Sequence, residues 1–314
     1  MSRNIVGVLV LLGLVLSLQA CVPNTQYQPE YNLTKLERSS DLRERQAGSP
    51  SQKKVEVSLS GRTDLGLSDD RLVSVEEYLA AAEFHALLIA VEEYEELPNL
   101  KTPISDVRVL GGLLERSYGF ETKTLINPSR AEIVEVLTEY RSNLRSQDSF
   151  LIYYAGHGWL DSEAEEGYWL PRDAQQENPA NWLSNSTITA YLKAIESKHL
   201  MVVADSCYSG TLTRGLNLQQ RSPNYYEKMV SKKSRTVLTS GGLEPVSDSG
   251  GIGNHSVFAS AMFKALNGNS GIIDGSDIFN SVKRPVQFNS DQVPQYSIIH
   301  KAGHDGGDFL FVKR

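Results

Sequence analysis

The chain has 314 residues, with 31 Lys and Arg against 38 Asp and Glu, and 40% of its residues are hydrophobic. This length is enough for one large or two small domains with a hydrophobic core. A formal charge of −7 disfavours nucleic acid as a partner, and two cysteines without a Cys/His ligand spacing exclude disulfide-rich and zinc-finger scaffolds.

The N-terminus carries an apolar run over residues 5–18, preceded by Arg3. Fourteen residues are too few for a spanning helix, which needs about 20, so the length favours a secretory signal peptide over residues 1–20. The segment that ends in Leu18-Gln19-Ala20-Cys21 resembles the lipobox of bacterial lipoproteins, which are cleaved before the cysteine. The alternative is an uncleaved signal anchor.

The lipobox resemblance implies that Cys21 is lipidated and holds an exported protein on a membrane. Residue 22 is Val and not the Asp of an inner-membrane retention signal, so the resemblance indicates the periplasmic face of the outer membrane. Acylation of Cys21 would leave Cys207 as the only thiol, in a compartment where thiols are readily oxidised. Such a lone thiol calls for an explanation.

The remaining chain divides into a polar part and a folded part. Residues 21–80 contain few apolar runs and are expected to form a tether, with a short amphipathic helix over residues 73–82 at its end. From residue 81 to residue 314, short apolar runs alternate with helical periodicity. We assign this part to one folded domain.

Alternating elements predict the fold class. Buried strands are expected over residues 86–91, 123–126, 150–155, 200–204, 236–239 and 309–312, and helices over residues 130–144, 185–196, 255–266 and 276–288. Strand and helix in alternation imply right-handed crossovers and a mostly parallel sheet with helices on both faces. The fold class is therefore α/β, with three layers.

Chemically active side chains follow two of the predicted strands. His157 lies two residues after the run 150–155, and Cys207 lies three residues after the run 200–204. Sites in open α/β sheets lie at the carboxyl ends of strands, so both side chains should emerge at one edge of the sheet. A thiol and an imidazole at one edge are the arrangement that nucleophilic catalysis needs.

The sequence around these two residues resembles a known family. Tyr-Tyr-Ala-Gly-His157-Gly and Asp-Ser-Cys207-Tyr-Ser-Gly are similar to motifs of the caspase and metacaspase superfamily of cysteine peptidases, and more closely to its bacterial caspase-domain members. The resemblance extends from about residue 85 to the C-terminus. It implies a caspase-like fold, peptide-bond hydrolysis by a Cys207/His157 dyad, and an oxyanion hole formed by the main-chain amides of Gly158 and Cys207.

The chemistry of the two side chains fits these roles. A thiol with an ordinary pKa near 8.5 is mostly protonated at neutral pH, so a nearby imidazole that takes its proton raises the thiolate fraction. Cys207 would attack the peptide carbonyl, and His157 would protonate the departing amine and then activate water. No Asp or Asn stands out as a group that orients the imidazole.

Substrate preference is predicted from the residues beside the dyad. Asp205 stands two residues before Cys207, where caspases specific for aspartate have Gln. A carboxylate there would attract Arg or Lys. The metacaspase resemblance places a second acid at Asp106 and a serine where this chain has Ala155, so one polar contact is missing. Asp205 could instead cap a helix after its strand.

Several alternatives remain open. A catalytically inactive caspase-like lipoprotein that binds peptides or proteins is the alternative function. Trp169 and Trp182 line a peptide groove or belong to the core. The segment 211–233 is interpreted as a long loop that could be cleaved for activation.

Metal and cofactor binding are not expected. The acidic segment from residue 161 to residue 166 could bind Ca²⁺, but it lacks the spacing and glycine of an EF-hand, which favours a solvated loop. His300 and His304 are placed in a loop and not on a helical metal-binding face. The sequence offers no chemical partner for three further histidines, which are interpreted as structural: His85, His199 and His255.

Overall fold

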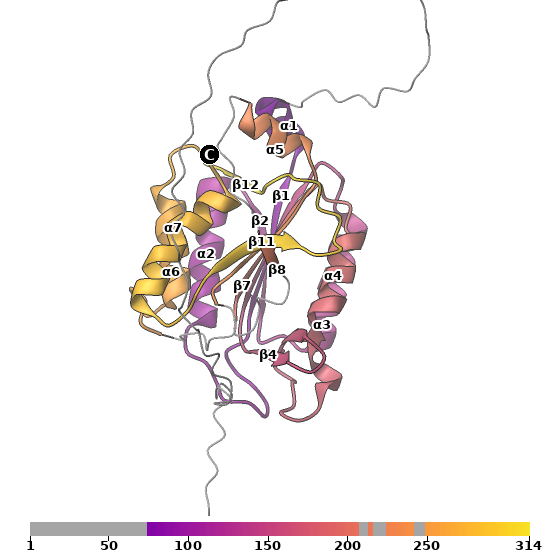
Figure 1. Ribbon diagram of the computed structural model, residues 1–314, viewed down its shortest axis with the longest axis vertical. Coiled ribbons are helices and arrows are strands. Elements are labelled where there is room, and N and C mark those ends of the chain that lie inside the picture. The colour runs from indigo at the N-terminus through magenta and orange to yellow at the C-terminus, as the bar shows by residue number, and fades with distance from the viewer. Residues whose placement is uncertain (1–73, 207–212, 216–223, 242–248) are drawn as a thin grey trace, which may run out of the picture. The chain divides into compact units, whose positions relative to one another are not determined.

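The structure is a computed structural model that describes residues 74–206, 213–215, 224–241 and 249–314. A seven-stranded sheet forms its centre, in the order β2-β1-β3-β7-β9-β11-β8 (Figure 1). Its strands are β1 (Phe84–Ala90), β2 (Glu121–Ile126), β3 (Ser149–Ala155), β7 (His199–Asp205), β8 (Thr213–Gly215), β9 (Ser234–Thr239) and β11 (Gln295–Ile299). The first five in spatial order are parallel, whereas β11 runs antiparallel to β9 and β8. The predicted mostly parallel sheet is confirmed.

Helices cover both faces of this sheet (Figure 1). One face carries α2 (Pro103–Tyr118), α6 (Val257–Gly268) and α7 (Gly275–Asn289), and the other carries α3 (Arg130–Asn143) and α4 (Asn185–Ala194). A hydrophobic core lies between the sheet and the helices on each face. Along β3, Leu151 and Tyr153 pack in the core beneath α2, α6 and α7, and Phe150 and Ile152 pack in the core beneath α3 and α4. Burial on both faces explains why the strand is a continuous apolar run, and the three-layer α/β class is confirmed.

The described part begins with a packed helix, α1 (Val75–Ala81). Ser74 and Glu77 form a capping box at its start. Tyr78 is buried, and its hydroxyl hydrogen-bonds Ser149 at the start of β3. The folded unit therefore includes the chain from Ser74 onward, a few residues before the boundary at residue 81.

No helix in the described ranges is both long and apolar enough to cross a bilayer. The apolar run 5–18, Cys21 and Cys207 lie outside the described residues. The signal peptide, the lipid anchor and the position of the thiol therefore stay predictions.

Some elements of the fold carry little sequence signal. A separate small sheet contains β4 (Gly158–Asp161), β5 (Glu166–Trp169) and β6 (Leu183–Ser184), with a 3₁₀ turn at Pro179–Asn181 before β6. A second pair joins β10 (Ile272–Asp274) to β12 (Leu310–Val312). The prediction of one long loop over residues 211–233 was wrong, because β8 and a helix, α5 (Tyr225–Ser231), lie within it. Only Val230 of that helix is buried, so it has little apolar periodicity.

Candidate active site

The carboxyl ends of β3 and β7 lie side by side. Ala155 and Asp205 are register partners at the ends of these parallel strands. The amide of Gly156 donates to the carbonyl of Asp205 at 3.4 Å, which keeps the two chains together past the last paired residues. His157 and Asp205 therefore lie at one edge of the sheet. The predicted meeting of Cys207 with His157 at this edge stays a prediction, because Cys207 lies outside the described residues.

His157 is held by groups from the segment after β1. Its Nε2 lies 2.8 Å from the carbonyl oxygen of Pro98, and its amide donates to the hydroxyl of Tyr94 at 2.7 Å. The Tyr94 ring also packs against the imidazole, with ring centres 4.7 Å apart. A carbonyl only accepts, so the Nε2 carries the proton and Nδ1 of the neutral ring carries the lone pair. Nδ1 is therefore the nitrogen that can take a proton.

This contact supplies the orienting group that the sequence did not reveal. A backbone carbonyl fixes the ring of His157, in the place where an Asp or Asn side chain would act. Any residue at position 98 offers a carbonyl, so the contact leaves no mark in the sequence.

The backbone of His157 is held by Tyr154, which in turn packs against Trp169. The Tyr154 hydroxyl donates to the carbonyl of His157 at 2.7 Å and accepts from the amide of Leu170 at 3.1 Å. Its ring stacks on Trp169, with centres 4.4 Å apart. Trp169 is 1% exposed, so it belongs to the core and does not line a groove.

Trp182 differs from Trp169 because it is only half-buried. It contacts the rings of Trp159 and Tyr168, and its Nε1 donates to the carbonyl of Gln175 at 2.8 Å.

Gly158 begins β4 directly after His157. Its role in an oxyanion hole stays a prediction, because the second donor, Cys207, is outside the described range.

The two predicted substrate-binding acids converge on one serine. Ser256 donates its hydroxyl to Asp205 Oδ2 at 2.6 Å and its amide to Asp106 Oδ2 at 3.3 Å. The same hydroxyl caps α6 by accepting from the amide of Ala259 at 2.9 Å. The structure thus brings together acids that are 99 residues apart in the sequence. All three are buried: Asp106 is 1%, Asp205 5% and Ser256 3% exposed.

The two carboxyl groups that bind Ser256, those of Asp106 and Asp205, place acidic charge close together in a buried environment. Burial raises the pKa of Asp106 above its ordinary value, and hydrogen bonds from His255 and Ser256 oppose that shift. Burial also raises the pKa of Tyr153 far above its ordinary value, with further contributions from Asp205 and Asp106. The N-terminus of α6 stabilises the two carboxylates through its positive dipole end.

His255 is not the isolated structural histidine that the sequence suggested. Its Nδ1 lies 2.6 Å from Asp106 Oδ1. The two residues are 149 positions apart, and nothing in the local pattern of either links them. The interpretation of His255 as a residue without a chemical partner was therefore wrong.

Two further segments considered as metal sites, the acidic segment 161–166 and the pair His300 and His304, lie in a turn and a loop. The acidic segment connects β4 to β5, and Asp161 Oδ1 accepts from the amides of Glu163 and Ala164, as expected for an exposed turn. His300 and His304 lie in a loop, as predicted, and His304 Nδ1 accepts from the amide of Arg235 at 3.2 Å.

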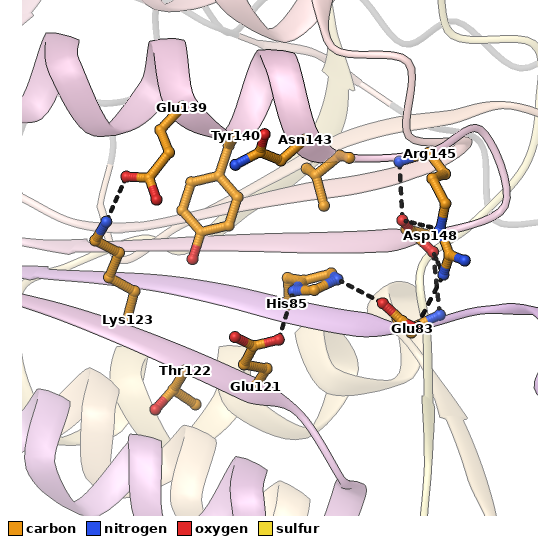
Figure 2. A pocket seen from close by; sticks show the side chains of 11 residues that line it. Glu83, His85, Glu121, Thr122, Lys123, Glu139, Tyr140, Asn143, Arg145 and Asp148 are labelled. Atoms are coloured by element: carbon orange, nitrogen blue, oxygen red, sulfur yellow. Dashed lines mark hydrogen bonds and ion pairs between the residues drawn. The ribbon is translucent and has the colours of Figure 1, made fainter.

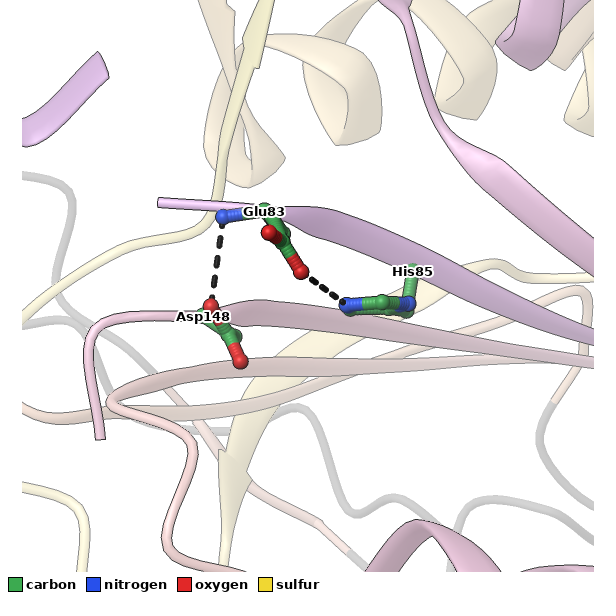
Figure 3. A group of neighbouring side chains, drawn as sticks. All are labelled: Glu83, His85 and Asp148. Atoms are coloured by element: carbon green, nitrogen blue, oxygen red, sulfur yellow. Dashed lines mark hydrogen bonds and ion pairs between the residues drawn. The ribbon is translucent and has the colours of Figure 1, made fainter. Parts of the chain in front are cut away.

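A group with metal-ligand atoms lies at the opposite edge of the sheet. Ligand atoms of Glu83, His85 and Asp148 lie within 4.8 Å of one another, in a pocket of about 280 Å³ (Figures 2 and 3). Arg145 already binds these carboxylates, at 2.9 Å from Asp148 Oδ1 and 3.1 Å from Glu83 Oε1. A cation entering this pocket would have to displace the guanidinium, so we assign no metal here.

The folded part of this chain is similar to known proteins. The family model described as the caspase domain matches residues 83–301. A stretch of 158 residues, 46% of this chain, is 31% identical to the human mucosa-associated lymphoid tissue lymphoma translocation protein 1 and covers 18% of it. A stretch of 145 residues, 40% of this chain, is 23% identical to Metacaspase-1 of Botryotinia fuckeliana and covers 34% of it. The chain thus spans about a third or less of these curated relatives.

Two solved structures align with part of this chain. The crystal structure of Caspase-1 from Spodoptera frugiperda aligns with a TM-score of 0.49 and 16% identity, and the alignment covers 69% of this chain and 86% of that one. A crystal structure of a Geobacter sulfurreducens protein aligns with the same score and identity over 68% of this chain and 92% of that one.

Proposed function

Because this chain belongs to the caspase-domain family, a family of cysteine peptidases, we propose that it is an endopeptidase that cleaves peptide bonds after Arg or Lys. The observation that carries the specificity is the pair Asp106 and Asp205, which Ser256 holds together beside the strand end that leads to His157. Two carboxylates at one place attract a cationic side chain and repel an acidic one.

The proposed reaction follows from the tautomer of His157. Nδ1 takes the thiol proton of Cys207, and the sulfur attacks the peptide carbonyl to give a tetrahedral oxyanion that the amides of Gly158 and Cys207 stabilise. The intermediate collapses as the imidazolium gives its proton to the departing amine, which leaves an acyl-enzyme. Water, deprotonated by His157, then releases the acid product and the free thiol.

A cleavage profile on a peptide library tests this specificity. We expect products that end in Arg or Lys. Asp205→Asn should lower kcat/KM for an Arg peptide about 30-fold or more, because a buried charge that meets the substrate is lost. The amide oxygen of Asn can still accept from Ser256, so the melting temperature should change by only a few degrees.

Asp291→Asn is the matched control, since Asp291 is exposed, and it should leave the profile unchanged. Equal rates on Arg and Asp peptides in the wild-type protein would refute the proposed specificity. A folded protein that binds these peptides without cleaving them would support the alternative, a non-catalytic binding module.

We further propose that the mature protein is exported and anchored by a lipid on Cys21. The support is the apolar run 5–18 followed by the lipobox-like segment. In a bacterial host, Cys21→Ser should abolish incorporation of labelled fatty acid and leave the leader uncleaved. Incorporation that persists in Cys21→Ser would show that the lipid is attached elsewhere. Wild-type protein without label would refute the anchor.

A further inference from the structure

The acid at position 106 is poorly placed to meet a substrate directly. Asp106 is 1% exposed, and both of its oxygens are already occupied, Oδ1 by His255 and Oδ2 by the amide of Ser256. A substrate cation would have to displace one of these donors to reach the carboxylate. Asp106 therefore influences a bound substrate through the two groups that it binds, the imidazole of His255 and the amide of Ser256.

His255 is the more accessible of these groups. Its side chain is 15% exposed, and Phe263 packs edge-on against the ring with centres 5.3 Å apart. Ser105 Oγ also lies 3.4 Å from Nδ1, on the same side as Asp106. Three contacts from α2 and α6 thus fix the orientation of the imidazole.

The contact with Asp106 determines which ring nitrogen is a donor. An ionised carboxylate only accepts, so Nδ1 carries the proton and Nε2 of the neutral ring has a lone pair. Within the described ranges, no hydrogen bond to His255 Nε2 is found. Gly253 has a φ of +75°, and a Cβ added there would lie 3.9 Å from Nε2, so a side chain at this position would come into contact with that nitrogen, whereas the glycine adds none.

His255 lies close in the chain to residues of the proposed substrate-binding site. Ser256, the next residue, binds Asp205, which pairs with Ala155 two residues before His157. Ser256 thus binds both acids, and His255, the residue before it, binds one of them. A basic side chain drawn to Asp205 would meet His255 Nε2 as a neighbouring acceptor.

We propose that His255 is a specificity-determining residue of this site: Asp106 fixes its ring, and its Nε2 accepts a hydrogen bond from the basic side chain before the scissile bond. This inference rests on the proposed peptidase function. It assigns Asp106 the role of a positioning residue, which acts on substrate through His255.

The test uses two peptides that differ only in Lys or norleucine before the scissile bond, because norleucine lacks just the ammonium group. His255→Asn keeps an amide N–H near the position of Nδ1, which can still bind Asp106, but has no acceptor near the position of Nε2. We expect the Lys-to-norleucine ratio of kcat/KM to fall about tenfold, through a higher KM for the Lys peptide. His255→Gln, whose longer side chain offers both a donor and an acceptor, should keep the ratio within about threefold of wild type.

His85→Ala is the matched control. Its side chain is also 15% exposed and lies between two carboxylates, Glu83 and Glu121, but at the opposite edge of the sheet (Figure 2). It should leave the ratio unchanged. An unchanged or higher ratio in a folded His255→Asn protein would overturn the inference, because the basic side chain would then be recognised without His255. Wild-type protein that cleaves neither this pair nor an Arg peptide would overturn the proposed function, and this inference with it.

Discussion

His157→Ala should lower kcat/KM for peptide hydrolysis roughly a thousandfold or more, the largest change in activity that we expect from a change to a described residue. In the proposed mechanism the imidazole serves both steps, first as acid for the leaving amine and then as base for water. The carbonyl of Pro98 keeps the proton on Nε2, so Nδ1 is the nitrogen that would carry out these transfers. Without the ring, neither transfer has a positioned partner. Initial rates on an Arg peptide measure the effect.

Labelling separates a lost catalyst from a lost fold. A basic peptidyl electrophile should modify Cys207 stoichiometrically in the wild-type protein and much more slowly in His157→Ala, because the thiolate fraction falls. His85→Ala should label at the wild-type rate, since His85 lies at the far edge of the sheet. Equal labelling of wild type and His157→Ala, with equal melting temperatures, would remove His157 from the mechanism.

The sequence predicted the central strands well because burial dominates their composition. β3 and β7 are buried at every position, so their continuous apolar runs identified them to within one residue at each end. β4, β5 and β6 are only two to four residues long and partly exposed, so none of them forms a continuous apolar run that would identify it as a strand. β11 was missed for a related reason, since Gln295 and Ser297 interrupt its apolar pattern.

The residues of the candidate site also fall into those that the sequence predicted and those that it did not. His157 was found because it comes just after β3, whose apolar run marks the carboxyl edge of the sheet, and Asp205 and Asp106 were found by resemblance. Pro98, Ser256 and His255 were missed as parts of the site. Pro98 acts through its main chain, and the serine and histidine join the acids only through the packing of α6 against α2. Local pattern does not encode such contacts.

Arg235 is the most consequential buried residue whose role the sequence did not suggest. It is 0% exposed on β9, and burial lowers the pKa of its guanidinium to about 10. Its five N–H groups donate to five carbonyl oxygens at 2.7–3.2 Å, those of Leu192, Ile195, Ser197, Lys198 and Ser234. Two of these carbonyls, at residues 192 and 195, belong to the end of α4, where a cation also opposes the negative end of the helix dipole. One side chain thus satisfies the helix end and the turn that leads to β7.

Arg235→Met should therefore lower the free energy of unfolding by about 4 kcal/mol or more, because it fills the volume but leaves several buried carbonyls without donors. In thermal unfolding this corresponds to a fall in melting temperature of roughly 8–16 °C. Arg235→Lys should fall between this variant and wild type, since an ammonium has three donors and not five. Arg141→Met, at an exposed position of α3, should change the stability by less than about 0.5 kcal/mol. If Arg235→Met and Arg141→Met unfolded at the same temperature, the five carbonyls would not depend on the guanidinium. The coupling of α4 to the sheet would then have to come from apolar packing, chiefly that of Ile188, Leu192 and Ile195.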